Sequence, residues 1–316
     1  MDDKDTLIIA HRGASGYLPE HTLESKAYAH AVGAHFIEQD LVATRDDHLV
    51  VLHDIYLDQV TNVVQAFPGR HRDDGRYYVR DFDLSEIKNL RVWERRKKGG
   101  TEAVFPNRFP TGVGHFRVST LREEIKLIQG LNMASGRVAG IYPEIKRPKW
   151  HRVEGVDITV LALDLLAEFG YRTRKDAVYL QCFDLEELQR IRKELGCQLK
   201  LVQLIAENEW SESDTDYEKL KTLAGLKQIA GIVDGVGPWF GQLVDFNPNG
   251  RQPVSTGFVS AAHEVGLVVH PYTFRADQLP PGFDSLQEMV CWFVNQLEID
   301  GLFTDFPDIA LRALQD

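Results

Sequence analysis

The sequence predicts an α/β protein that folds as a TIM (β/α)8 barrel with a small insertion after the second strand. Short apolar, β-branched runs alternate with longer stretches of helical periodicity along most of the 316 residues. Eight such runs are present, and eight parallel strands close a barrel of this kind. An open doubly wound sheet is the alternative, but it typically carries a phosphate-binding glycine loop, and the sequence contains none.

The predicted strands and helices follow one another in regular order. We expect strands at residues 7–11, 36–42, 140–145, 178–183, 200–205, 232–236, 267–272 and 301–304. We expect helices at residues 22–32, 121–131, 156–169, 185–195, 219–229, 256–265, 286–297 and 309–314. Capping residues support several of these helices, because Thr22, Thr120 and Asp184 stand at N-cap positions and Gly33 and Gly170 follow helix ends.

One long segment interrupts this order after the second strand. Residues 49–54 are predicted to form the return arm of a hairpin that folds back over the sheet. Residues 55–117 are rich in turn signals, and a structureless loop of that length is unusual within a compact core. We therefore predict that residues 1–316 form a single domain, in which residues 55–117 are an insertion over one mouth of the barrel.

Composition and charge exclude several classes of protein. The chain has 36 Lys+Arg against 47 Asp+Glu, a net charge of −11, and such an acidic chain is not a dedicated nucleic-acid binder. No apolar run approaches the roughly 20 residues that a membrane span requires, so we expect no stable membrane insertion. Cys182, Cys197 and Cys291 are too scattered for a zinc ribbon or a disulfide scaffold, and we expect the last two to pack within helices.

The N-terminus bears on cellular location. The first predicted strand begins at Leu7 and only a polar stretch precedes it, so the sequence as written carries no signal peptide and predicts a cytoplasmic protein. The periplasm is the alternative if a cleaved leader has been replaced by Met1. The sequence leaves the oligomeric state open.

Three carboxylates fall at the ends of predicted strands, where barrel active sites are built. Glu38 and Asp40 are separated by one residue and therefore point to the same face of a strand. Glu144 ends another strand and brings a third carboxylate to the same rim. This oxygen-only set suits one hard divalent cation, Ca²⁺ or Mg²⁺. The alternative is a structural salt-bridge network with Arg12 or Lys146.

Two histidines, His11 and His53, also lie at strand ends beside these carboxylates. Two imidazoles with pKa values near neutrality can serve as base and acid across a hydrolysed bond, although a histidine at a strand end is often only a hydrogen-bonded rim residue. Arg12 and Lys146 supply positive charge, which suits an anionic substrate such as a phosphodiester.

Other residues near strand ends have two interpretations. Gln181, Phe183 and Trp239 either line the substrate pocket or pack against the rim. We expect the basic run at residues 95–98 to be a solvated loop cluster. A further group is predicted to have structural rather than catalytic roles: Glu20, His270, Tyr272 and Asp305.

Several motifs, taken in order, point to a known family. They are residues 11–22 (HRGASGYLPEHT), 38–40 (EQD), 49–54 (LVVLHD), 142–146 (YPEIK), 179–184 (YLQCFD), 269–273 (VHPYT) and 301–307 (GLFTDFP). The chain resembles the glycerophosphodiester phosphodiesterases from about residue 7 to residue 314. The insertion and residues 107–116 are most similar to the bacterial periplasmic branch of that family.

This resemblance implies a TIM barrel with one divalent cation held by Glu38, Asp40 and Glu144. It also implies that His11 and His53 are the acid/base pair. Ca²⁺ is the usual metal of the periplasmic branch, and Mg²⁺ is the alternative.

The resemblance further implies that Arg12 and Lys146 contact the phosphate. The family hydrolyses glycerophosphodiesters, such as glycerophosphocholine and glycerophosphoethanolamine, to sn-glycerol 3-phosphate and the free alcohol. If the insertion caps the pocket, deacylated diesters enter and intact phospholipids do not.

Two other functions stay open at this point. A phospholipase-type phosphodiesterase on a related barrel would be expected to carry an exposed apolar loop, and none is obvious in the sequence. A non-catalytic binding protein on the same barrel is the second alternative, and the presence of both histidines and all three carboxylates counts against it.

Overall fold

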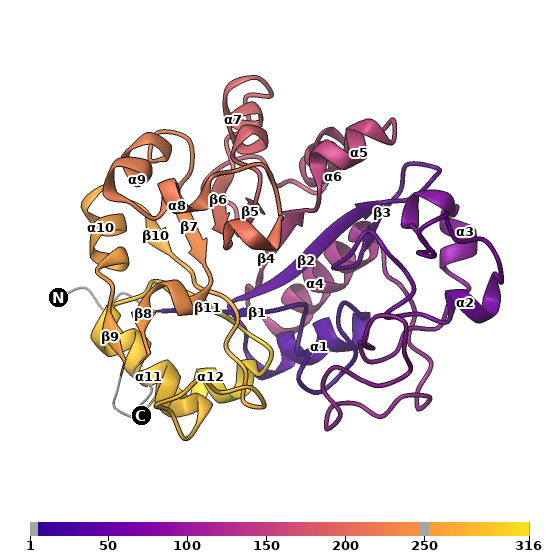
Figure 1. The fold of residues 1–316 in the computed structure, drawn as a ribbon, viewed down its shortest axis with the longest axis horizontal. Helices are drawn as coiled ribbons and strands as arrows, with labels where there is room; N and C mark the ends of the chain where they lie inside the picture. The colour runs from indigo at the N-terminus through magenta and orange to yellow at the C-terminus, as the bar shows by residue number, and fades with distance from the viewer. Residues whose placement is uncertain (1–5, 247–252, 316) are drawn as a thin grey trace.

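Eight parallel strands form a nearly closed ring in the computed structural model, which describes residues 6–246 and 253–315 (Figure 1). They pair in the order β10-β7-β6-β5-β4-β2-β1-β11. Between β10 and β11 the ring is bridged by Phe274, which pairs with Thr304. The strands of the ring are β1 (Leu7–Ala10), β2 (Phe36–Ala43), β4 (Gly140–Ile145), β5 (Tyr179–Cys182), β6 (Lys200–Ile205), β7 (Gly235–Pro238), β10 (Val268–Val269) and β11 (Gly301–Thr304). The predicted TIM barrel is confirmed.

Helices surround this ring and follow the strands in alternation (Figure 1). The longer ones are α1 (Leu23–Val32), α4 (Leu121–Ser135), α6 (Ile158–Glu168), α7 (Leu185–Lys193), α9 (Leu223–Ile229), α10 (Phe258–Glu264), α11 (Leu286–Leu297) and α12 (Pro307–Ala313). Short helical turns are α5 (Pro148–Val153), η2 (Asn208–Trp210), α8 (Tyr217–Leu220) and η3 (Phe240–Gln242). The predicted N-caps hold, since the side chains of Thr22, Thr120 and Asp184 each accept hydrogen bonds from backbone N–H groups of the helix they precede.

Three predicted elements differ from the structure. The strand expected at 232–236 begins only at Gly235, because Ile232 and Val233 donate their N–H groups to Ile229 in the turn that ends α9. The strand expected at 267–272 is reduced to β10, since Pro271 has no N–H group with which to extend the ladder. The helix expected at 219–229 is divided into α8 and α9, because Thr222 caps a new helix start.

One cysteine also differs from its predicted setting. Cys197 lies beyond the end of α7, where its N–H group donates to Ile191, so it packs in the core from a loop rather than from a helix. Cys291 lies on α11 and packs against the core, as predicted.

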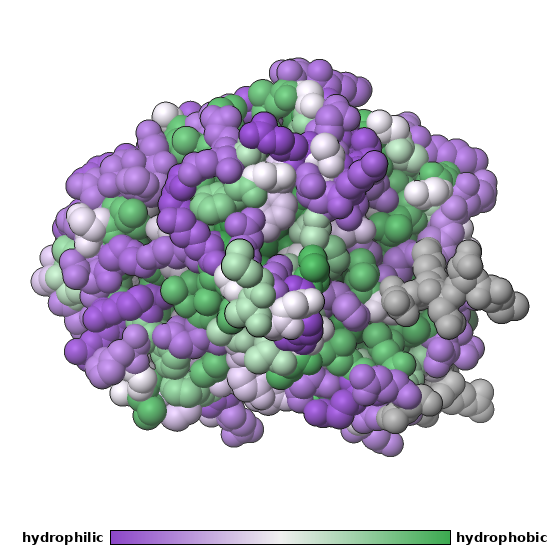
Figure 2. All heavy atoms as spheres, turned by 180° about the vertical axis from the view of Figure 1, so that it is seen from behind, coloured by the Kyte–Doolittle hydropathy of each residue, from purple (hydrophilic) through white to green (hydrophobic). Residues whose placement is uncertain are grey.

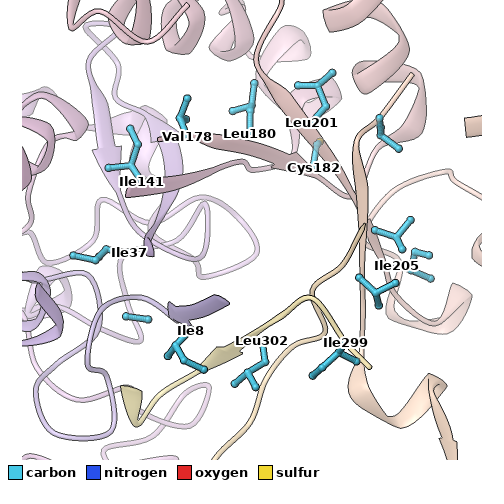
Figure 3. Packing of buried hydrophobic residues seen from close by; sticks show 14 of the residues in the cluster. Ile8, Ile37, Ile141, Val178, Leu180, Cys182, Leu201, Ile205, Ile299 and Leu302 are labelled. Atoms are coloured by element: carbon cyan, nitrogen blue, oxygen red, sulfur yellow. The ribbon is translucent and has the colours of Figure 1, made fainter. Parts of the chain in front are cut away.

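Side chains of the barrel strands alternate between two apolar layers. Figure 3 shows members of the larger cluster, including Ile8, Ile37 and Leu302, distributed around the ring of strands, and this cluster also contains the buried residues of the surrounding helices. Neighbouring positions such as Ile9 and Phe303 belong to a separate cluster inside the barrel. This alternation of period two directs every second residue inward, including the polar residues at the strand ends.

The insertion has structure and a core of its own. The strand β3 (Leu49–Val51) pairs antiparallel with β2, as the hairpin prediction requires. Beyond it, α2 (Val63–Ala66), η1 (Val79–Asp81) and α3 (Leu84–Ile87) lie beside the β2–β3 hairpin (Figure 1). Their apolar side chains form a second buried cluster with Val42 and Val50 of the hairpin. Arg72 and Arg108 join the insertion to Glu154 and Asp277 at 2.8 Å each, so it is fixed at two separate points of the barrel rim.

Hydrophilic residues cover most of the face in Figure 2, with smaller groups of apolar side chains between them. Within the described part of the chain, no helix combines the length and the apolarity that crossing a membrane requires. The most exposed large apolar side chains there, such as Met133, Val153 and Val254, belong to separate elements.

Candidate active site

The three predicted carboxylates converge at one end of the barrel. Glu38 and Asp40 lie on β2, and the parallel register places Asp40 beside Glu144 of β4. One oxygen atom from each of the three residues lies within 4.8 Å of the others. All three side chains are buried, so uncompensated negative charge here is costly.

Cations contact this cluster without saturating it. Lys146 Nζ lies 2.8 Å from Glu144 Oε1, and Arg12 Nε lies 3.7 Å from Asp40 Oδ2. The salt-bridge network considered from the sequence is therefore partly present. Among the described residues, however, Asp40 Oδ1 is buried and has no hydrogen-bond partner. An unpartnered carboxylate oxygen within an all-oxygen cluster fits a hard divalent cation.

Two further contacts orient the Glu38 carboxylate. The backbone N–H of Arg12 donates to Oε2 at 2.8 Å, and Gln181 Nε2 donates to Oε1 at 2.9 Å. Gln181, predicted to bind substrate, thus contacts a candidate metal ligand directly.

The three carboxyl groups differ in pKa, although burial favours the protonated form of each. Burial and the adjacent Asp40 carboxylate raise the pKa of Glu38 to about 8, and burial raises the pKa of Glu144 well above its usual range. Burial acts in the same direction on Asp40, yet Lys146 and His21 together hold its pKa well below the usual range. A cation that binds to this cluster therefore displaces protons from it.

His21, which the sequence analysis did not single out as a site residue, forms a hydrogen bond with Asp40. Its Nε2 lies 2.7 Å from Asp40 Oδ2, and its Nδ1 lies 3.0 Å from the buried Lys26 Nζ. Because an ammonium group only donates, Nδ1 is the acceptor and Nε2 carries the proton that it donates to Asp40. This contact occupies Oδ2 and leaves Oδ1 without a hydrogen-bond partner among the described residues, and outer-shell partners make such contacts to metal ligands.

Each predicted histidine is held by a carboxylate. His11 Nδ1 donates to Asp305 Oδ1 at 2.5 Å, and His53 Nδ1 donates to Asp54 Oδ1 at 2.8 Å. Burial, with Arg12 as the next cause, lowers the pKa of His11 to about 4 and also lowers the pKa of His53. Both rings are therefore neutral near pH 7, and each presents an unprotonated Nε2 that can accept a proton.

Arginines hold these carboxylates in turn. Arg108 and Arg275 donate to Asp305 Oδ2 at 2.7 and 2.8 Å. Arg95 donates to Asp54 Oδ2 at 2.5 Å. Burial opposes ionisation of both carboxyl groups, but their cationic partners keep the pKa of each well below its usual range. Asp305, predicted to have a structural rather than a catalytic role, contacts a candidate catalytic imidazole.

The basic run at 95–98 is not a solvated cluster throughout, so that prediction is wrong for its first member. The Arg95 side chain is only 13% exposed, and it also pairs with Glu20 at 2.6 Å. Arg96 stacks on Trp93, and Lys97 alone extends to an exposed partner, Glu102. Charge runs in loops are usually solvated, and only the fold shows which member turns inward.

The predicted site residues line a cavity of about 270 Å³. Its walls include all of the candidates: His11, Arg12, Glu38, Asp40, His53, Glu144, Lys146, Gln181, Phe183 and Trp239. Trp210 and Tyr272 are further aromatic residues in the lining of this cavity. The Trp239 ring lies 5.5 Å from that of Trp210, so Trp239 both lines the cavity and packs in its rim.

The sequence matches a known family. The sequence profile of the glycerophosphoryl diester phosphodiesterase family matches residues 11–309. The chain belongs to this family. It is a phosphodiesterase, and hence a hydrolase, as the resemblance in its motifs implied.

Individual relatives agree with this assignment. A glycerophosphodiester phosphodiesterase of Haemophilus influenzae is 45% identical to this phosphodiesterase, over 98% of the present chain and 90% of the relative. A crystal structure from Silicibacter pomeroyi, described under the same family name, has a TM-score of 0.74 at 24% identity and covers 98% of this chain and 93% of that one. An Oleispira antarctica phosphodiesterase, solved in complex with the product sn-glycerol-3-phosphate, has a TM-score of 0.65 at 18% identity and covers 98% and 97% of the two chains.

Proposed function

We propose that this phosphodiesterase hydrolyses glycerophosphodiesters, such as glycerophosphocholine and glycerophosphoethanolamine, to sn-glycerol 3-phosphate and the free alcohol. The observation that carries the proposal is the convergence of three buried carboxylates and two carboxylate-held imidazoles on one cavity. The family name and the product bound by the Oleispira antarctica protein support the same substrate class.

Glu38, Asp40 and Glu144 would hold one divalent cation, Ca²⁺ or Mg²⁺. When bound, the cation would neutralise negative charge that grows on the phosphate during the reaction. The protein adds positive charge of its own, because Arg12 and Lys146 line the same cavity. The Nζ of Lys146 has a raised pKa, since the acidic groups around it more than offset the effect of burial, so it remains an ammonium.

The two imidazoles would move the protons. One Nε2 takes the proton of the attacking hydroxyl, which belongs to water or to the adjacent glycerol carbon. The other imidazole first takes up a proton from solvent at its own Nε2 and then delivers that proton to the leaving alcohol oxygen. Because both Nδ1 atoms already donate to carboxylates, only the Nε2 atoms are available for this transfer. We assign the base role to His11, because its Nε2 lies 3.8 Å from Oε2 of Glu38, one of the candidate metal ligands.

Release of sn-glycerol 3-phosphate from glycerophosphocholine tests the proposal. We expect activity to be lost in EDTA and to return with Ca²⁺ or Mg²⁺. A His11→Ala variant should lose roughly 10²-fold or more in kcat, whereas His48→Ala, at an exposed turn, should not. Full activity in EDTA would overturn the metal assignment, and a loss below about tenfold in a folded His11→Ala variant would remove His11 from the mechanism.

A further inference from the structure

A lysine with no access to solvent lies next to the candidate metal site. The side chain of Lys26, near the start of α1, is completely buried, and it carries an ammonium group into the core. Lysine is almost never fully buried unless it is paired, because removing an ammonium group from water is costly. An apolar side chain would fill this position at lower cost, so the contacts of the ammonium group indicate why a lysine is present.

Three acceptors surround this ammonium group. Its Nζ donates to the backbone carbonyl oxygen of Glu38, lies 3.0 Å from His21 Nδ1 and lies 3.3 Å from Glu124 Oε2. An ammonium group has three N–H donors and no acceptor, so these three contacts account for all of its donors. Two of the contacts lead to candidate metal ligands, one to the backbone of Glu38 and the other, through the His21 ring, to the side chain of Asp40.

The contact with Glu38 lies where a strand pairing ends. β1 pairs with β2 as far as Ala10 and Ile37, so Glu38 is the first residue of β2 beyond this pairing. Lys26 donates to the carbonyl oxygen of Glu38 at this point. The lysine therefore stabilises the backbone of β2 at the position of a candidate ligand.

The backbone of His21 is held as well as its ring. His21 has a φ of 58°, in the left-handed region that residues other than glycine rarely adopt. Its N–H donates to the carbonyl oxygen of Arg12 at 2.9 Å, and its own carbonyl oxygen lies 3.0 Å from Ser119 Oγ. Ser119 Oγ also lies 2.6 Å from Glu124 Oε1, so the partner of the lysine also supports this backbone. A strained conformation that its surroundings hold from several sides is typical of a residue at a functional site.

We infer that Lys26 is a positioning residue for the candidate metal site. It keeps the proton of the His21 ring at Nε2, where it is donated to Asp40, and it fixes the backbone of Glu38. This inference rests on the proposed function, in which Glu38 and Asp40 hold the cation. The alternative is that Lys26 and Glu124 form only a structural ion pair between α1 and α4.

Ca²⁺ binding separates these two explanations. In Lys26→Met the His21 ring loses its partner at Nδ1, and we expect the Ca²⁺ affinity of the EDTA-treated full chain, measured by isothermal titration calorimetry, to fall roughly tenfold. This variant also leaves the Glu124 carboxylate buried without its cation, which lowers stability. In Lys26→Met/Glu124→Gln neither charge remains. The melting temperature should therefore recover toward that of the unmodified protein, while the affinity should stay about tenfold lower.

The His21 ring gives a second measurement that involves no cation. In metal-free protein labelled with ¹⁵N-histidine, the His21 signals are identified by their absence from His21→Ala. We expect a protonated Nε2 and a hydrogen-bonded, unprotonated Nδ1 in the unmodified protein, and the Nδ1 signal should shift in both Lys26 variants. Lys88→Met is the matched control, because Lys88 pairs with Glu123 at 2.8 Å beside the same helix start. It should change neither the affinity nor the His21 signals.

Two results would overturn the inference. One is recovery of both stability and affinity in the double variant, which would show that the ion pair is only structural. The other is an unchanged Nδ1 signal in the Lys26 variants. Absence of Ca²⁺ and Mg²⁺ binding by the unmodified protein would instead overturn the metal site of the proposed function, and the spectrum of the metal-free protein would still test the contact between Lys26 and His21.

Discussion

The His11 imidazole and the Asp305 carboxylate share a hydrogen bond of 2.5 Å between residues that are 294 positions apart in the sequence. Closure of the barrel creates this contact, because β1 and β11 are neighbours in the ring. The bond fixes the tautomer of His11 and turns its Nε2 toward the cavity. Asp305 is therefore a positioning residue for the candidate base.

Removing the charge of Asp305 tests this role. In Asp305→Asn the amide can donate to Nδ1, which favours the wrong tautomer, and we expect kcat to fall roughly 10²-fold or more with little change in KM. Steady-state kinetics and the pH–rate profile measure the effect.

A matched control is available at Asp277, which pairs with Arg108 as Asp305 does but does not touch His11. Asp277→Asn should retain most of the activity. An equal loss in both variants would show that the ion-pair network, rather than the imidazole contact, limits turnover.

His21 is expected to set the affinity for the cation. Replacing it with Ala frees Asp40 Oδ2 from its 2.7 Å contact and leaves Lys26 without its ring partner. Loss of such an outer-shell contact typically weakens metal binding by about 10- to 100-fold. Isothermal titration calorimetry of EDTA-treated protein with Ca²⁺ measures this affinity directly. His30→Ala is the comparison, since His30 lies on α1 and contacts Asn132 instead of the site; the same loss of affinity there would contradict the assignment.

The sequence predicted the candidate ligands because they obey a local rule. Glu38 and Asp40 are two positions apart on one strand, and strand periodicity alone places them on one face. Their meeting with Glu144 followed from the convergence of the carboxyl ends of parallel strands. The positions of all three could therefore be derived before any coordinates were known.

The supporting contacts obey no such rule. Asp54 and Asp305 lie within the motifs at 49–54 and 301–307, and Arg95 begins the basic run, but no spacing in the sequence pairs Asp305 with His11 or Arg95 with Asp54. Arg95 turns inward only because Glu20 and Asp54 lie on either side of it in the folded protein. His21 immediately precedes the α1 N-cap, so its motif position was visible although its partner was not. Contacts between residues that are far apart in the sequence form when the barrel closes, and they cannot be predicted without knowledge of the fold.

Glu94 in the insertion should make stability depend on pH. It is buried, and burial together with the nearby Glu20 raises its pKa from 4.5 to about 8. The folded protein thus binds this proton more tightly than the unfolded chain, so its contribution to stability is complete below pH 4.5 and is lost as pH rises through 8. In Glu94→Gln the melting temperature should rise by several degrees at pH 9 and change little at pH 5. Thermal unfolding followed by circular dichroism at the two pH values tests this, with the exposed Glu102→Gln as control; parallel shifts at both pH values would contradict it.

The position of the insertion predicts selection against intact phospholipids. Val104, Phe105 and Arg108 of the insertion line a cavity of about 280 Å³ that the two histidines also line, and Arg108 is fixed there by ion pairs to Asp277 and Asp305. A diester whose glycerol hydroxyls are free can reach the histidines, whereas two long acyl chains would have to pass this wall. We expect turnover of phosphatidylcholine vesicles to be at least about 10²-fold below that of glycerophosphocholine at equal phosphate concentration, since a misplaced phosphate loses that much reactivity. Short-chain phosphatidylcholine in micelles tests whether vesicles react slowly only because their lipids are held in a bilayer. We expect it to remain a poor substrate, because its acyl groups still occupy the glycerol hydroxyls. Comparable turnover of vesicles and glycerophosphocholine would show that the insertion does not restrict entry.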